Sequence, residues 1–172
     1  CEMYVDFIYL LIQKEYNVNE ILNIKCSEFA EQLSEYKECE AGYERSVTTE
    51  NYDKFCEYNK ENEKRRALSS FFVICADLDI IDKTDMTKII VDFIEGVKQD
   101  ISKEGKLNNV EEMVQNISIM INAGKSFLTG LDEFEDILNE IEIFSLMNHK
   151  KYPSLSSKIV FKFMDLYEEL EE

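Results

Sequence analysis

The chain has 172 residues, of which 45% are hydrophobic, and a formal net charge of −17. This length and apolar content exclude an intrinsically disordered chain, and the acidic balance disfavours nucleic acid and anionic membranes, which both attract Lys and Arg. One proline and five glycines leave long helices uninterrupted, so we predict an all-α fold in a single domain over residues 1–172.

The first two predicted helices span about residues 3–16 and 18–37 and form a helical hairpin. Asn17 can cap the second helix, with Glu20 reaching back as in a capping box. Each helix carries apolar residues at helical spacing, which predicts one buried face per helix. These residues are Tyr4, Ile8, Leu11 and Ile12 in the first helix, and Val18, Ile21, Leu22, Cys26, Phe29 and Leu33 in the second.

Residues 38–63 form a polar and highly charged stretch with weak apolar periodicity. Two interpretations are open: a mobile insertion, or a solvated extension of the flanking helices. Long segments of this kind are usually functional or disordered, and we expect disorder here. The stretch is therefore predicted to be a variable acidic linker between the first hairpin and the rest of the domain.

A second hairpin is predicted over residues 64–81 and about 85–101. Thr84 or Asp85 is the expected cap of its second helix. Apolar residues recur at i, i+3, i+4 and i+7, which predicts a buried stripe on each helix. They are Leu68, Phe71, Phe72, Cys75 and Leu78, followed by Met86, Ile90, Phe93, Ile94 and Val97.

A third hairpin and a closing helix complete the chain. The hairpin begins near Asn108 or Asn109 and turns at Gly130 into a helix over about 131–147, and the closing helix follows Pro153. The predicted buried residues are Val110, Met113, Val114, Ile117, Met120, Ile121, Phe134, Ile137, Leu138, Ile141, Phe144, Ile159, Val160, Phe163, Leu166, Tyr167 and Leu170.

The repetition of hairpins predicts the architecture. Three hairpins of ~35 to 45 residues followed by an unpaired seventh helix fit an α-α superhelix, a HEAT-type solenoid of about seven helices. In such a solenoid each hairpin buries its apolar face against its neighbours. A closed helical bundle is the alternative, because periodicity alone does not separate the two.

The five cysteines, at positions 1, 26, 39, 56 and 75, are an odd number without paired spacing. Cys26 and Cys75 fall on apolar helix faces and are expected in the core. Free thiols favour a reducing compartment, and we expect the cytoplasm. No apolar run approaches the ~20 residues of a membrane span. Because the helical pattern begins almost at Cys1, we expect a fragment of a longer protein.

The sequence holds no constellation typical of catalysis or metal binding. Its single histidine, His149, lies in a predicted surface loop without a nucleophile partner. The run DLDIIDKTD resembles a calcium loop only briefly, because its sixth position is Asp82 instead of Gly and its twelfth is Lys88 instead of Glu. We therefore expect no enzyme activity, no cofactor and no metal.

Two charged clusters are candidates for partner contact. An acidic turn at a hairpin tip could meet a basic protein, since solenoids often bind partners at such tips, although a plain solvated turn explains it equally well. A basic run could meet an acidic partner or a phosphate, or could simply offset the acidic linker before it. The candidates are Asp77, Asp79 and Asp82 in the turn, and Lys64, Arg65 and Arg66 in the run.

Three blocks of sequence carry a resemblance to a known family. They read LNIKCSEF (22–29), RRALSSFFVI (65–74) and SSKIVFKFMDLYEEL (156–170). In this order they resemble blocks in the middle, HEAT-repeat domain of the translation initiation factor 4G family: Leu-Asn before Glu-Phe, a basic cluster before Leu-Gly-Asn, and Ser-Ser-Arg-Ile-Arg-Phe before an Asp. Here Ser69-Ser70 replaces Gly-Asn, and Lys158 and Val160 replace the two arginines.

The resemblance implies a scaffold that binds a DEAD-box RNA helicase of the initiation factor 4A type and holds its two lobes half-open. It implies further partner contacts at Asn23, Glu28, Lys158 and Lys162, and contacts to other initiation factors through flanking regions. Relatives also touch RNA, which the charge of −17 disfavours here. The chain would lack the first repeat of the family. The alternatives are a related scaffold in mRNA splicing or decay, and a helical protein-binding regulator, of viral or other origin, with no role in translation.

Overall fold

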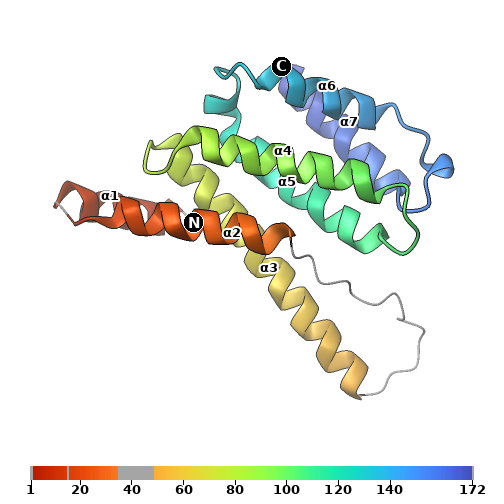
Figure 1. Ribbon diagram of the computed structural model, residues 1–172, viewed down its shortest axis with the longest axis horizontal. Helices are drawn as coiled ribbons and strands as arrows, with labels where there is room; N and C mark the ends of the chain where they lie inside the picture. Colours follow the sequence, from red (N-terminus) through yellow and green to blue (C-terminus); the bar gives the residue numbers. More distant parts are fainter. Residues whose placement is uncertain (1, 15, 35–48, 172) are drawn as a thin grey trace.

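A computed structural model describes residues 2–14, 16–34 and 49–171 of the chain (Figure 1). Every regular element in these ranges is helical, which confirms the all-α prediction and its seven α-helices. The elements are α1 (Glu2–Gln13), α2 (Val18–Ser34), α3 (Thr49–Asp77), α4 (Lys83–Asp100), α5 (Leu107–Leu128), α6 (Phe134–Ser145), the short 3-10 helix η1 (His149–Lys151) and α7 (Ser157–Glu171).

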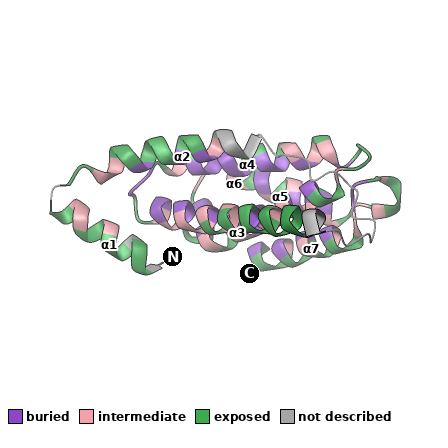
Figure 2. Ribbon diagram, turned by 90° about the horizontal axis from the view of Figure 1, so that it is seen from below, coloured by how far each residue is buried: buried purple, intermediate pink, exposed green. Residues whose placement is uncertain are grey.

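The helices pack on two sides of a shared core. Figure 2 shows α2 and α4 along one side and α1, α3 and α7 along the other. Helix α5 packs against α3, α4 and α7, and α6 packs chiefly against α7. The last helix, predicted to follow the third hairpin without a hairpin partner of its own, packs against α6: the rings of Phe144 on α6 and Phe163 on α7 stack with centroids 4.6 Å apart. The HEAT-type arrangement of the hairpins stays a prediction.

Helix α3 is longer at its start and shorter at its end than the sequence predicts. It begins at Thr49, so the expected disorder is wrong for residues 49–63, while residues 38–48 lie outside the described part of the chain. A polar segment can extend a helix that its packed second half has already nucleated, because propagation adds one hydrogen bond per residue. The helix ends at Asp77, and Leu78, predicted to be buried, is 43% exposed.

Helices α4 and α5 form the best-predicted part of the core. All five residues of the predicted α4 stripe are buried, as are those of α5 from Val110 to Ile121. The predicted cap of α4 was wrong: Asp82 caps it, and one carboxylate oxygen accepts the N–H of Thr84 at 2.7 Å. Cys26 and Cys75 are buried free thiols, as expected.

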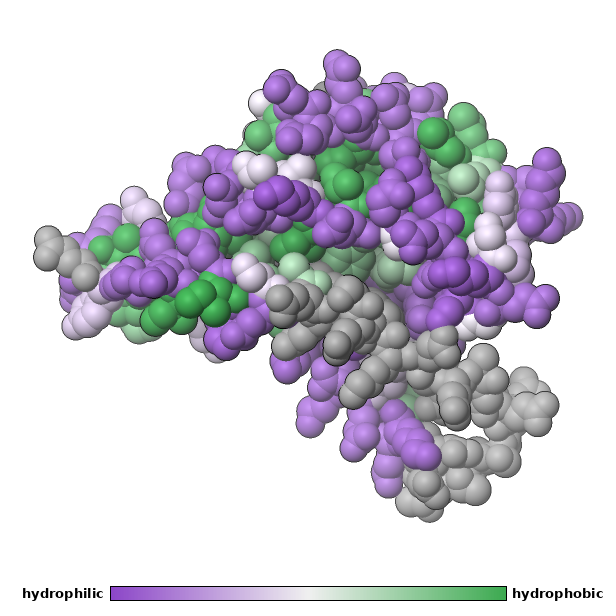
Figure 3. Space-filling view, in the orientation of Figure 1, coloured by the Kyte–Doolittle hydropathy of each residue, from purple (hydrophilic) through white to green (hydrophobic). Residues whose placement is uncertain are grey.

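The α1–α2 end is less buried than its periodicity predicts. Tyr4 and Ile21, both assigned to inward faces, are 66% and 59% exposed. Helix α1 ends at Gln13 instead of residue 16, and its main neighbours are α2 and α3, which leave much of its surface open. Figure 3 shows hydrophobic side chains reaching the surface at this end. Asn17 pairs with the Glu20 side chain at 2.8 Å.

A buried serine in the segment before α7 fixes where that helix begins. The Ser154 hydroxyl donates to the carbonyl of Lys103 at 2.5 Å and accepts the N–H of Lys106 at 3.0 Å. The Ser154 N–H also donates to the carbonyl of Ile101 at 3.1 Å. These bonds tie the start of α7 to the loop between α4 and α5, so the first turns of α5 and α7 lie side by side.

Candidate partner-binding groove

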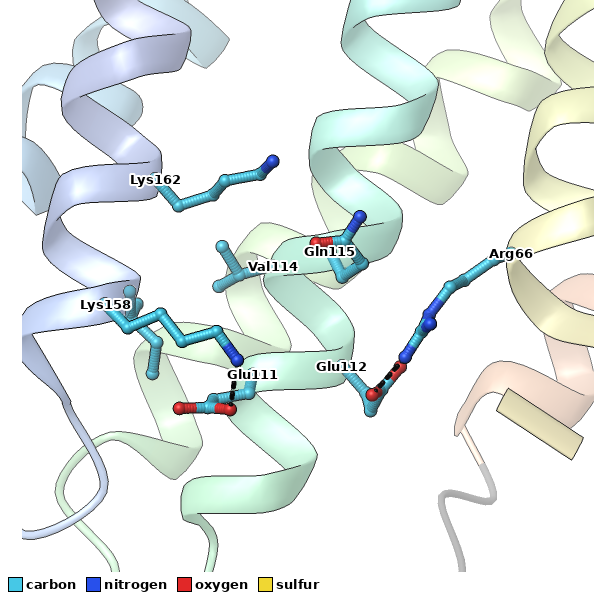
Figure 4. Close-up of a pocket in the computed structure, with 8 residues that line it drawn as sticks. Arg66, Glu111, Glu112, Val114, Gln115, Lys158 and Lys162 are labelled. Atoms are coloured by element: carbon cyan, nitrogen blue, oxygen red, sulfur yellow. Dashed lines mark hydrogen bonds and ion pairs between the residues drawn. The ribbon is translucent and has the colours of Figure 1, made fainter. Parts of the chain in front are cut away.

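A groove of about 290 Å³ lies where α3, α5 and α7 meet. Three of the residues predicted from sequence to bind a partner line it: Arg66 from α3, and Lys158 and Lys162 from α7. Figure 4 shows their side chains converging on the face of α5. The remaining lining residues are Glu111, Glu112, Val114, Gln115 and Ile159.

An ion pair between Arg66 and Glu112 closes the α3 side of the groove. The guanidinium binds both carboxylate oxygens, with Nε to Oε2 at 3.0 Å and Nη2 to Oε1. Beneath it, the buried Ser69 hydroxyl donates to Asn116 Oδ1 at 2.8 Å, and Asn116 Nδ2 donates to the Glu112 carbonyl at 2.7 Å. This chain of contacts holds α3 and α5 in a defined register, and it places Arg66 at the rim.

The α7 side of the groove carries two lysines, of which one is paired with a carboxylate and the other is not. Lys158 Nζ pairs with Glu111 Oε2 at 2.8 Å, and Ser156 Oγ donates to the other Glu111 oxygen at 3.2 Å. Lys162, one turn further along, is half-buried and extends toward Gln115 on α5 (Figure 4). Within the described part of the chain, its ammonium makes no hydrogen bond or ion pair.

The groove is locally cationic although the chain as a whole is acidic. Three cations and two carboxylates line it, so the local charge is 3 − 2 = +1, against −17 for the whole sequence. The two carboxylates are each engaged by a cation of the groove itself. The remaining positive charge therefore belongs to Lys162, and a negatively charged group of a partner would meet it first.

The groove has the features of a contact surface, because its charged side chains are largely paired with one another between helices. Among the described residues, no cluster of three or more His, Cys, Asp or Glu side chains could hold a metal ion. The described helices also include none that combines the length and apolar character needed to cross a membrane.

The predicted acidic turn lies apart from the groove, between α3 and α4. Asp77 accepts a hydrogen bond from Ser126 of α5, and Asp79 pairs with Lys83 at 2.7 Å while adopting a left-handed φ of 57°. The Asp82 carboxylate accepts the backbone N–H of Thr84, which lowers the pKa of Asp82 below its usual range. Each of these aspartates already has a partner within the chain.

The other predicted contact residues do not join either cluster. Asn23 and Glu28 are exposed on α2, where Glu28 pairs with Lys25 at 2.6 Å. Lys64 is exposed, and Arg65 donates to Asn62 at 2.5 Å, both on α3. The predicted contact residues thus lie at several separate places, and the structure brings only Arg66, Lys158 and Lys162 together in one groove.

Sequence reasoning missed the α5 contribution to the groove. Glu111, Glu112 and Gln115 were not among the residues predicted to contact a partner. A signal was present: Glu112, Gln115 and Asn116 are polar residues at i, i+3 and i+4, beside the apolar stripe of the same helix. A polar stripe on a helix buried on its remaining sides indicates a charged neighbour or an open groove.

Comparisons with known proteins found no match: no family model, no curated protein and no solved structure matches the chain.

Proposed function

We propose that the chain is a non-enzymatic scaffold domain that binds a DEAD-box RNA helicase of the initiation factor 4A type, in translation initiation in the cytoplasm. The proposal rests on the resemblance of three sequence blocks to the initiation factor 4G family. Its physical content is a difference in affinity: a scaffold that binds one arrangement of the two helicase lobes more tightly than others shifts the population toward that arrangement.

The observation that carries the proposal is that the second block of resemblance lies next to each of the other two. Phe29 of the first block and Phe72 of the second lie with ring centroids 5.2 Å apart. Arg66 of the second block and Lys158 of the third line the same groove. This arrangement is the one expected if the three blocks are parts of one binding domain.

The direct experiment titrates a fluorescently labelled 4A-type helicase with the chain and measures its ATPase rate. We expect a dissociation constant below ~10 μM, the range of a moderate protein contact, and a higher ATPase rate with the chain present. Absence of binding at several times that concentration would overturn the proposal. Binding without any change in ATPase rate would mean that the chain binds the helicase but does not shift the arrangement of its two lobes.

A matched pair of variants tests whether the acidic turn contributes. Asp79→Asn removes a charge while keeping a residue that tolerates positive φ, and Glu104→Gln removes one exposed charge at the opposite end of α4. Because exposed rim charges act mainly on association rates, we expect Asp79→Asn to slow association roughly two- to fivefold and Glu104→Gln to leave it unchanged. Equal rates for both variants would place the contact elsewhere on the chain.

A further inference from the structure

We propose that the α3–α5–α7 groove receives the carboxylate of one Asp or Glu side chain of the helicase, with the Lys162 ammonium as its counter-ion. The inference rests on the proposed function and names the chemistry of one contact within that complex. It assigns to Lys162 a role that none of the other charged residues of the groove can fill.

The reason for singling out Lys162 is that the other charges of the groove are already satisfied. Arg66 holds both oxygens of Glu112, and Lys158 together with Ser156 holds Glu111. A partner carboxylate at either of those cations would have to displace a native ion pair. At Lys162 it would gain a charge-assisted hydrogen bond and displace only water.

The size and lining of the groove fit a side chain. A volume of about 290 Å³ is at the lower end of ligand pockets, and it accommodates a carboxylate and its methylene stem but not a folded loop. Val114 and Ile159 supply a small, largely covered apolar part of the lining, and Gln115 lies on α5 on the side toward which Lys162 extends (Figure 4). The groove thus combines a small apolar lining with one cation, Lys162, that has no partner among the described residues.

Electrostatics favour a single carboxylate over a nucleic acid. A phosphate backbone brings a charge every few ångströms, so neighbouring phosphates would fall near Glu111 and Glu112 and in the field of an acidic chain. A lone carboxylate on a helicase surface places its one charge at the locally cationic spot. The binding of RNA is therefore an alternative outcome of the test, not the proposal.

The experiment compares three substitutions in the helicase titration. Lys162→Gln removes the charge, Lys162→Arg keeps it, and Lys150→Gln is the matched control, since Lys150 is an exposed lysine of η1 that does not line the groove. Loss of one charge-assisted hydrogen bond should weaken binding about tenfold in Lys162→Gln. Lys162→Arg and Lys150→Gln should stay within about twofold of the unmodified chain. A uridine oligonucleotide is titrated in parallel.

The outcomes separate this inference from the function on which it rests. If the unmodified chain does not bind the helicase, the proposed function fails, and the inference falls with it. If the unmodified chain binds but Lys162→Gln binds equally well, or Lys150→Gln weakens binding as much, only the groove contact is overturned. If the oligonucleotide binds and Lys162→Gln abolishes that binding, the groove is a nucleic-acid site and the carboxylate assignment is wrong.

Discussion

The buried hydrogen bond between Ser69 and Asn116 supplies the sharpest test of how α3 and α5 hold the groove together. Both residues are fully buried, and the bond measures 2.8 Å. Ser69→Ala removes the donor and leaves Asn116 Oδ1 buried without a partner, which costs about 1–3 kcal/mol of unfolding free energy. Ser69 also stands where the resembling family has a glycine, so this contact is one that a glycine could not make.

Removing the other partner of this bond, in Asn116→Leu, should cost less unfolding free energy than Ser69→Ala, because the Ser69 hydroxyl has a second acceptor within reach and the Asn116 oxygen does not. In Asn116→Leu the Ser69 hydroxyl can turn to the carbonyl four residues earlier in its own helix. Leucine is close to asparagine in shape and has a higher helix propensity. In the double variant Ser69→Ala/Asn116→Leu no buried polar atom is left unpaired, so its loss should be smaller than that of Ser69→Ala alone.

Urea unfolding followed by circular dichroism measures all three variants, with Ser70→Ala as the matched control on the neighbouring, half-buried serine. We expect the control to stay within about 0.5 kcal/mol of the unmodified chain. The reasoning is refuted if Ser69→Ala also stays within that margin. It is also refuted if the double variant is no more stable than Ser69→Ala, because the loss of unfolding free energy would then not come from the unpaired Asn116 oxygen. Comparable m-values are needed for these comparisons.

Three further predictions concern packing, capping and thiol reactivity. A Cβ on Gly124 would lie 2.8 Å from a methyl of Val73, so Gly124→Ala should lose about 1 kcal/mol net of its helix-propensity gain and melt a few degrees lower by circular dichroism. The pKa of Asp82 is lowered in the folded chain, so its charged form stabilises the fold above the ordinary aspartate pKa, and this stabilisation is lost as pH falls through the lowered pKa. Asp82→Asn should keep the helix cap and remove this part of the pH dependence. Urea titrations at about pH 7 and about pH 3 measure the difference. Burial raises the pKa of Cys75 to about 12, so maleimide should label it only in urea, whereas the exposed Cys56 should react in the folded chain, as peptide mass mapping can determine.

The parts of the fold that the sequence predicted well are those where burial alone decides the pattern. Helix α4 packs along its whole length, and its apolar stripe at Met86, Ile90 and Phe93 identified both the element and its inner face. Helix α5 is covered by α3, α4 and α7, so its stripe was equally clear. In such helices the period of 3.6 residues is sampled over several turns, and one exposed or polar position does not obscure it.

The errors arose where local sequence and tertiary contact disagree. The first half of α3 is a solvated helix that carries no apolar stripe, so its charges suggested a linker. Tyr4 and Ile21 have the spacing of buried residues but lie on helices with few neighbours. The packing of α6 against α7 is a tertiary contact, and the apolar period of each helix does not say which neighbour covers it.

The candidate groove was predictable only in part, because a partner site depends on which charges remain uncommitted after folding. The aspartates of the α3–α4 turn looked available in the sequence, yet each has a partner within the chain. Asp77 accepts a hydrogen bond from the Ser126 hydroxyl, Asp79 forms an ion pair with Lys83, and Asp82 accepts the backbone N–H of Thr84. A partner at that turn would have to share carboxylates that already have native partners. Lys162 was predicted as a partner contact together with Lys158, but the sequence did not distinguish the two: α5 supplies carboxylates to Arg66 and Lys158 and none to Lys162. A lysine without a partner among the described residues has no native ion pair to give up, so the gain on meeting a carboxylate is larger there than at a charge already paired. The candidate site therefore lies where the carboxylates of α5 leave one cation unpaired. Neither the net charge of the sequence nor its basic runs predict which cation that is.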